Sequence, residues 1–121
     1  MIIQKVFTGI GAALQKLFDK IKQIVVTIIK GVLQFLRDVV NWFKKLRLNP
    51  EEQTPFIVES ERLREMIHNA PVVDVGIFEG VYNEETDEIE HYREISAESL
   101  DQKTRSVLAN ANDENPIVVL S

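Results

Sequence analysis

Apolar residues recur every three or four positions along the first 48 residues of the chain. The average step is close to the period of an α-helix, about 3.6 residues. Polar side chains such as Gln15, Asp19 and Gln23 occupy positions between them. The pattern therefore predicts a long amphipathic helix with one apolar face. The recurring series is Ile3, Phe7, Ile10, Leu14, Leu17, Ile21, Ile24, Ile28, Val32, Leu36, Val39, Phe43 and Leu46.

The spacing of this series changes near Gly31. From Ile3 to Ile28 the steps alternate between four and three residues, which is the heptad seam of a coiled coil. Successive steps of four then lead to Leu36, and such a stutter locally unwinds a coiled coil. We therefore expect either one near-continuous helix or two helices hinged near Gly31. The continuous helix is favoured, because neither proline nor a polar loop surrounds this glycine.

A proline-containing stretch follows the predicted helix. Asn49 and Pro50 end the helix, because the residue before a proline disfavours helical geometry. A second proline, Pro55, lies shortly after. The chain is thus predicted to comprise a basic helical arm (1–48), a linker (49–57) and a small acidic α+β domain (58–121).

The predicted C-terminal domain has the element order α-β-β-α-β, so the expected fold class is α+β. Alternation of β-branched and aromatic residues predicts two strands, and Ile77, Glu79 and Val81 share one face of the first. In the second strand Arg93 and Ile95 share a face. The predicted elements are a helix over 60–69, strands over 72–82 and 88–95 joined by a turn over 83–87, a helix beginning at Ser96, and a strand over 116–121.

Charge is divided unevenly along the chain, whose formal net charge is −5. Residues 1–49 carry nine lysines and arginines against two aspartates, a formal charge of +7. Residues 50–121 carry five basic and seventeen acidic residues, a formal charge of −12. This asymmetry indicates different partners for the two parts, or attraction between them.

No motif indicates catalysis. The chain has no cysteine, so a disulfide, a thiolate nucleophile and a cysteine-rich zinc site are excluded. It also lacks the nucleophile-elbow, phosphate-binding and dinucleotide-binding motifs. His91 lies among glutamates, but adjacent strand residues point to opposite faces and no second nitrogen or sulfur ligand is near in sequence. We therefore expect no enzymatic activity, no cofactor and no metal site.

A partner must cover the apolar face, and three kinds of partner remain possible. Self-assembly into a bundle or filament is favoured by the heptad seam. Binding at an anionic membrane surface is the main alternative, because lysines flank a wide apolar face that includes Trp42. The third is docking into a groove of a larger complex. A single membrane span is not expected, since the uncharged run from Gln23 to Ile29 is far shorter than the about 20 residues needed.

The sequence thus favours a non-catalytic assembly protein, forming a homo-oligomer or binding a helical partner protein. Nucleic acid is not favoured as a partner, because the basic residues are spread among large aliphatic ones and the acidic domain would repel it. The expected location is the cytoplasm, including the membrane periphery. The predicted interaction face is the apolar series above together with Trp42. Candidate contacts to lipid or an acidic partner are Lys16, Lys20, Lys22, Lys30, Arg37, Lys44, Lys45 and Arg47.

Overall fold

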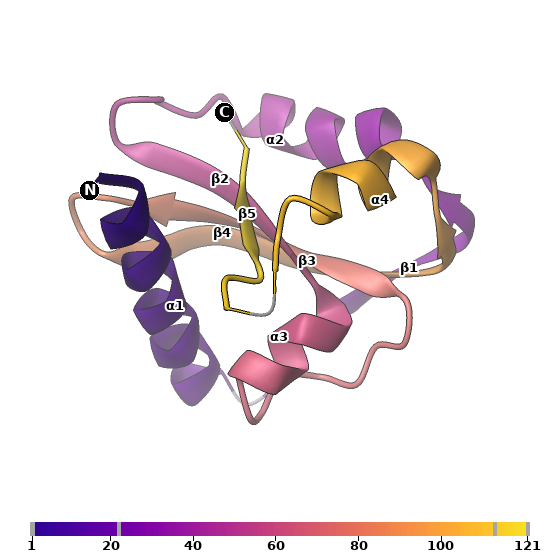
Figure 1. The fold of residues 1–121 in the computed structure, drawn as a ribbon, viewed down its shortest axis with the longest axis horizontal. Coiled ribbons are helices and arrows are strands. Elements are labelled where there is room, and N and C mark those ends of the chain that lie inside the picture. The colour runs from indigo at the N-terminus through magenta and orange to yellow at the C-terminus, as the bar shows by residue number, and fades with distance from the viewer. Residues whose placement is uncertain (1, 22, 113, 121) are drawn as a thin grey trace.

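The computed structural model describes residues 2–21, 23–112 and 114–120, with side chains described from Val6 onward (Figure 1). Helices and strands are mixed along the chain, as the predicted α+β class requires. The helices are α1 (Ile2–Lys20), the π-helix η1 (Phe35–Val40), α2 (Asn41–Leu46), α3 (Ser60–Met66) and α4 (Gln102–Leu108). The strands are β1 (Val26–Leu33), β2 (Gln53–Glu59), β3 (Gly76–Asn83), β4 (Glu88–Leu100) and β5 (Ile117–Val119).

The strands form one sheet in the order β1-β4-β3-β2-β5. β1 pairs in parallel with β4, whereas the β4–β3, β3–β2 and β2–β5 pairs are antiparallel. β3 and β4 form a hairpin in which Asn83 pairs with Glu88 and Glu79 pairs with Arg93. β1 and β5 are consequently the two edge strands of the sheet.

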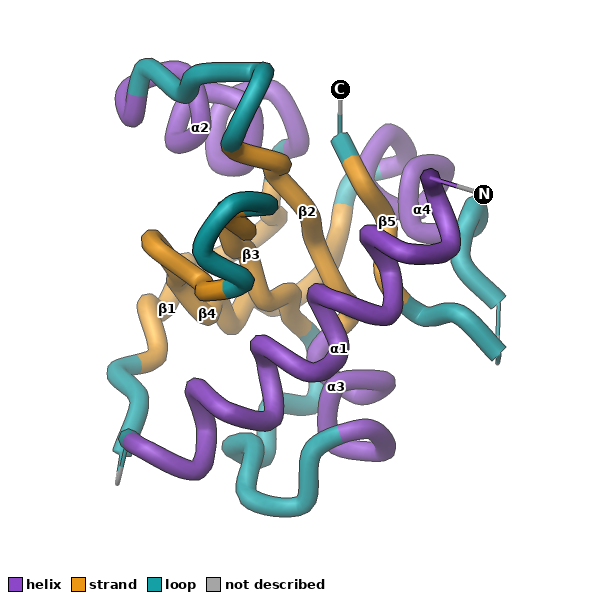
Figure 2. Tube along the Cα trace, turned by 90° about the vertical axis from the view of Figure 1, so that its left-hand side faces the viewer, coloured by secondary structure: helices purple, strands orange, loops and turns teal. Residues whose placement is uncertain are grey.

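Helices cover both faces of the sheet (Figures 1 and 2). Because side chains alternate along a strand, Phe56 and Val58 of β2 enter one hydrophobic cluster and Ile57 enters the other. α1 and α3 cover the first face, where Phe18 and Leu63 join Phe56 and Val58. η1, α2 and α4 cover the second face, where residues such as Phe43 join Ile57.

The predicted helix over residues 1–48 is wrong beyond Lys20. α1 ends there, and residues 26–33 form the edge strand β1. Val25 to Ile29 are five consecutive β-branched residues, which lose side-chain freedom in a helix and pack well in a sheet. The chain becomes helical again from Phe35 to Leu46. A strand therefore separates two helices where one helix was expected.

The predicted linker over 49–57 is also corrected by the structure. Its second half belongs to β2, which lies between β3 and β5 in the sheet. Pro55 is accommodated opposite Val81 in this strand. Both hydrophobic clusters combine residues from 1–48 with residues from 58–121. The predicted arm thus supplies one strand of the sheet and helices on both of its faces.

Gly31, the predicted hinge, lies at a bulge in β1. The pairing of β1 with β4 shifts register between Ile29 and Val32, and Gly31 has a φ of 96°. Glycine adopts this left-handed region without steric conflict, unlike residues with a Cβ. The bulge keeps Leu33 buried against the second face while Val32 is exposed.

β4 continues to Leu100, beyond the predicted helix start at Ser96. α4 begins only after Asp101, whose Oδ1 accepts hydrogen bonds from the Thr104 backbone N–H (2.8 Å) and hydroxyl (2.5 Å). The Asp101 Oδ2 also accepts a hydrogen bond from the Phe35 backbone N–H (3.1 Å). An N-cap of this kind satisfies a backbone donor that the first helical turn leaves free. Asp101 therefore fixes the starts of two helices on the second face.

The two glycines of α1 provide a matched test of how this helix packs. A Cβ at Gly9 would overlap the hydroxyl of Tyr82, whereas a Cβ at Gly11 would meet no atom within 4 Å. Tyr82 cannot move freely, since it is buried and donates a hydrogen bond to Asp87 Oδ1 (2.5 Å). Gly9→Ala should lower the free energy of unfolding by about 1–3 kcal/mol, the usual effect of overpacking. Gly11→Ala should raise it by about 1 kcal/mol through helix propensity. Urea denaturation followed by circular dichroism measures both, and equal effects would contradict this packing of α1.

Candidate functional site

The predicted interaction face is divided between the interior of the chain and the solvent. Ile10 and Leu14 are buried against the first face of the sheet, and Val39 and Phe43 against the second. Three predicted residues are exposed: Ile28, Val32 and Leu36. The side chain of Ile3 lies outside the described residues. The remaining predicted residues are partly buried against the same clusters: Phe7, Leu17, Ile21, Ile24, Trp42 and Leu46. The chain's own sheet therefore covers most of the face for which an external partner was expected.

Four exposed large apolar residues lie in one stretch, residues 25–36, here called the edge segment, whereas exposed Val72 and Tyr92 lie elsewhere. Val25 is 84% exposed, Ile28 76%, Val32 44% and Leu36 68%. Most of this segment is β1, which pairs only with β4 in the sheet of the described residues. Large apolar side chains on an unpaired strand edge are typical of surfaces that associate.

The end of the edge segment is held by an ion pair. The Arg37 guanidinium contacts Asp38 Oδ2 at 2.9 Å and donates a hydrogen bond to the carbonyl oxygen of Val32 at 3.0 Å. The hydrogen bond from Arg37 lowers the pKa of Asp38 below its ordinary value. Asp38 Oδ2 also accepts from the Gln34 backbone N–H at 2.7 Å. These contacts close the corner between β1 and η1, so exposed Leu36 lies at the start of η1, directly after this corner.

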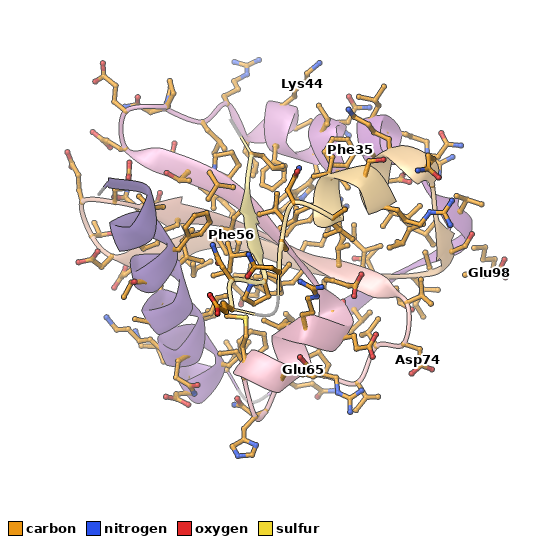
Figure 3. All side chains as sticks on the ribbon, in the orientation of Figure 1. Phe35, Lys44, Phe56, Glu65, Asp74 and Glu98 are labelled. Carbon is orange, nitrogen blue, oxygen red and sulfur yellow. The ribbon has the colours of Figure 1, made fainter. Side chains whose placement is uncertain are left out.

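The predicted cations do not form one basic stripe. Lys16 and Lys20 lie on α1, Lys30 lies on β1, and the Arg37 contacts are those given above. Lys44 and Lys45 lie on α2, on the other side of the sheet, and Arg47 follows them in a left-handed conformation. Lys22 lies outside the described residues. All the described members are exposed, and Figure 3 shows Lys44 pointing outward while Phe56 points into the interior.

A buried ion pair links the second face of the sheet to the helices that cover it. Arg93 donates from Nε and from a terminal nitrogen to Glu79 Oε1, at 2.8 and 2.7 Å. The same guanidinium donates to the carbonyl oxygen of Asp38 (2.6 Å) and lies 5.0 Å from the centre of the Trp42 ring. Glu79 is fully buried, and its Oε2 has no hydrogen-bond partner among the described residues. Burial raises the pKa of Glu79 to about 8, although the charge of Arg93 opposes this shift.

A second buried carboxyl group, that of Glu94, lies on the first face. The Ser60 hydroxyl donates to its Oε2 at 2.6 Å, and its Oε1 has no hydrogen-bond partner in the described part of the chain. Burial raises the pKa of Glu94 to about 7, against the opposing effect of the Ser60 hydrogen bond.

Sequence reasoning missed the roles of Glu79, Arg93 and Glu94. The signal for the ion pair was available, because Glu79 shares a strand face with Ile77 and Val81, both of which are buried. An acidic side chain on an apolar face indicates a buried partner. Glu94 offered no such signal, since its neighbours along the same strand face are the polar residues Tyr92 and Ser96.

Within the described residues, no three histidine or acidic side chains lie close enough together to hold a metal ion. In the same part of the chain, no helix combines the length and apolar character needed to cross a membrane. Comparisons with protein-family models, curated proteins and solved structures found no match to this chain.

Proposed function

We propose that this chain is a non-catalytic assembly protein that associates with further copies of itself through the edge segment, residues 25–36. The observation that carries the proposal is the exposure of Val25, Ile28 and Leu36 on and beside an edge strand. Burying one isoleucine side chain contributes about 1.5–3 kcal/mol. Several such residues from each of two copies would supply a substantial part of the free energy of association.

The strand edge adds a second source of attraction. An edge strand carries backbone N–H and carbonyl groups on its open side, which another strand can satisfy. A second copy offers the same strand, and pairing of identical surfaces closes a two-fold dimer. Lys30 and the bulge at Gly31 restrict how far such pairing extends along β1. Association is therefore expected to combine apolar contact with a short stretch of strand pairing.

Charge favours further contact between copies. The edge segment carries Lys30 and is followed directly by Arg37, whereas residues 50–121 carry most of the acidic side chains. Ion pairs between exposed groups weaken as salt screens them. Association through apolar contacts and ion pairs together should therefore weaken moderately, but not disappear, when the salt concentration is raised.

Sedimentation velocity of the intact chain over a wide concentration range tests this function. The wild type should show concentration-dependent association. Ile28→Glu should weaken association by about tenfold to a hundredfold, because it replaces the burial of one isoleucine by a charge in the interface. Val72→Glu is the matched control, since Val72 is 73% exposed but lies outside the edge segment. A wild type that stays monomeric throughout, or equal effects of the two variants, would refute the proposal.

A membrane surface is the second candidate partner, favoured by the presence of Lys30 and Arg37 beside the exposed apolar residues. Apolar side chains can enter the lipid interface while cations contact anionic headgroups. Co-sedimentation with vesicles containing anionic lipid tests this alternative. Binding at low salt that Ile28→Glu abolishes and Val72→Glu preserves would support it. Binding by neither the wild type nor the variants would exclude it.

A further inference from the structure

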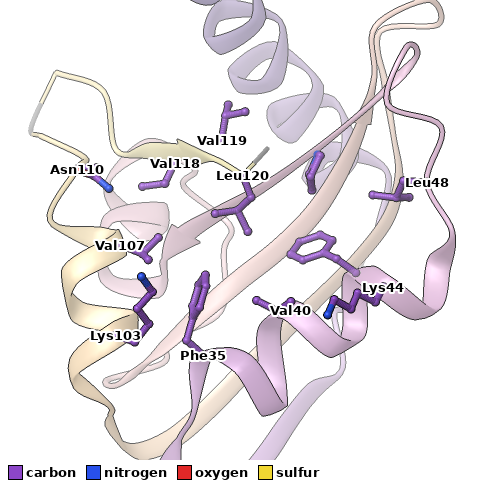
Figure 4. A pocket seen from close by; sticks show the side chains of 12 residues that line it. Phe35, Val40, Lys44, Leu48, Lys103, Val107, Asn110, Val118, Val119 and Leu120 are labelled. Carbon is purple, nitrogen blue, oxygen red and sulfur yellow. The ribbon is translucent and has the colours of Figure 1, made fainter.

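An apolar groove opens on the second face of the sheet, and among the residues of the edge segment only Phe35 lines it (Figure 4). Its volume is about 550 Å³, within the range of small-molecule sites, which is about 300–1,000 Å³. Phe35 and Phe43 line it from η1 and α2, Val107 from α4, and Leu120 from the residues after β5. The lining therefore combines three segments that are far apart in the sequence.

Two lysines supply the charge of the groove. Lys44 projects from α2 and Lys103 from α4, and Figure 4 shows them on opposite sides of Phe35. No aspartate or glutamate is among the described residues that line the groove. Neither lysine forms an ion pair or a side-chain hydrogen bond with the described part of the chain. The site is thus apolar and locally cationic on a chain whose net charge is −5.

We infer that this groove binds an aliphatic carboxylate, such as a medium-chain fatty acid. The alkyl chain lies against Phe35, Phe43 and Leu120, where it leaves water for an apolar surface. The carboxylate lies at the rim, in the positive field of Lys44 and Lys103, and the ammonium group that it meets donates a charge-assisted hydrogen bond. The side-chain amide of Asn110, which also lines the groove, provides one further donor.

The charge and shape of the groove favour this ligand class over others. A neutral hydrocarbon would leave both lysines without an anionic partner, and a cationic amphiphile would be repelled by them. A single anionic head with one flexible apolar tail matches both the two cations and the limited volume.

Calorimetric titration of the intact chain with decanoate, below its micelle concentration, tests the inference. We expect saturable binding, and octanoate, which is two methylenes shorter, should bind about fifteenfold more weakly, because each methylene contributes about fourfold in affinity. Decan-1-ol and decyltrimethylammonium, which have the same tail without the negative charge, should bind at least about tenfold more weakly than decanoate. Equal binding of the alcohol and the carboxylate would overturn the assignment of Lys44 and Lys103, and no binding of decanoate would overturn the site.

Amino-acid substitutions distinguish binding in this groove from nonspecific hydrophobic binding. Lys44→Gln combined with Lys103→Gln should weaken decanoate binding about tenfold, because the charge-assisted hydrogen bond and the positive charge of the rim are lost. Lys45→Gln is the matched control, since Lys45 is exposed on the same helix but does not line the groove. Amide chemical shifts should change around Phe35, Val107 and Leu120. Changes confined to strand β1 (Val26–Leu33) would instead overturn the proposal, because they would place the ligand on the strand edge and not in the groove.

Discussion

Replacing Glu94 with glutamine is expected to flatten the pH dependence of stability between about pH 4.5 and about pH 7. In the folded chain the carboxyl group is buried and contacts only the Ser60 hydroxyl among the described residues, so its charged form is disfavoured. The unfolded chain exposes the same group to water. Glu94 therefore keeps its proton on the folded chain at pH values where the unfolded chain has already lost it.

The sign of the effect follows from this difference in bound protons. Between the unfolded and folded pKa values the folded state binds more protons, so the free energy of unfolding falls as pH rises. The wild type should lose stability on the order of 3 kcal/mol from Glu94 across this window, and Glu94→Gln should not. Glu79, whose pKa is raised to about 8, adds a second fall that continues to higher pH in both proteins. The variant should consequently be more stable than the wild type at about pH 8 and similar to it at about pH 4.

Urea denaturation at a series of pH values, followed by circular dichroism, measures this difference. Glu98→Gln is the matched control, because Glu98 lies on the same strand and is exposed (Figure 3). The control should reproduce the wild-type slope. A slope in Glu94→Gln as steep as that of the wild type would show that the Glu94 carboxyl group is solvated in the folded chain.

The N-terminal helix was predictable from the sequence, but its end was not. Apolar spacing of three or four residues holds through Ile21, where α1 has just ended. The same apolar spacing continues to Ile28, because the fold does not require any particular spacing of apolar residues on the exposed side of an edge strand. The stronger signal was the β-branched run Val25 to Ile29, which favours a strand locally. Its partner, β4, lies about 70 residues further on, and pairing over that separation leaves no mark in local periodicity.

The candidate sites were predictable to different degrees. The expected turn over 83–87 would place Glu79 opposite His91, whereas a register shift between Val81 and Tyr82 pairs Glu79 with Arg93. An acidic residue on an apolar strand face was therefore visible in the sequence, but its partner was not. The exposed positions Ile28, Val32 and Leu36 were part of the predicted face, but their separation from the buried members depends on the fold. The groove was not predictable, because Lys44 and Lys103 are brought together only when α2 and α4 pack on the same face of the sheet.

Above about pH 8, where Glu79 is charged, Arg93→Met is expected to lower the free energy of unfolding by about 3–5 kcal/mol, as removal of one partner from a buried ion pair generally does. The substitution leaves Glu79 buried without its cation and removes the donor to the Asp38 carbonyl oxygen. The aliphatic part of methionine retains much of the packing against Trp42. The measured loss should therefore report the polar contacts of the guanidinium group more than a cavity.

The loss should grow with pH, and this dependence distinguishes the ion pair from packing. Arg93 lowers the pKa of Glu79, so its removal should raise that pKa above the about 8 of the wild type. At about pH 5 Glu79 is protonated in the folded state of both proteins, and the difference should be at its smallest. Above about pH 8 the Glu79 carboxylate of the wild type is charged and paired with Arg93. In the variant, folding at this pH must either bury the Glu79 charge without a cation or keep Glu79 protonated although the unfolded chain has lost that proton.

Removing both charges tests whether Glu79 is the source of this effect. Arg93→Met combined with Glu79→Leu should recover part of the stability and lose the added pH dependence, since no unpaired carboxyl group remains. Arg64→Met, an exposed substitution on α3, is the control and should change stability little. The fluorescence of Trp42, the single tryptophan, reports whether α2 stays on the sheet. If Arg93→Met were as mild as Arg64→Met at every pH, the apolar contacts of Val39 and Phe43 alone would hold η1 and α2 on the second face.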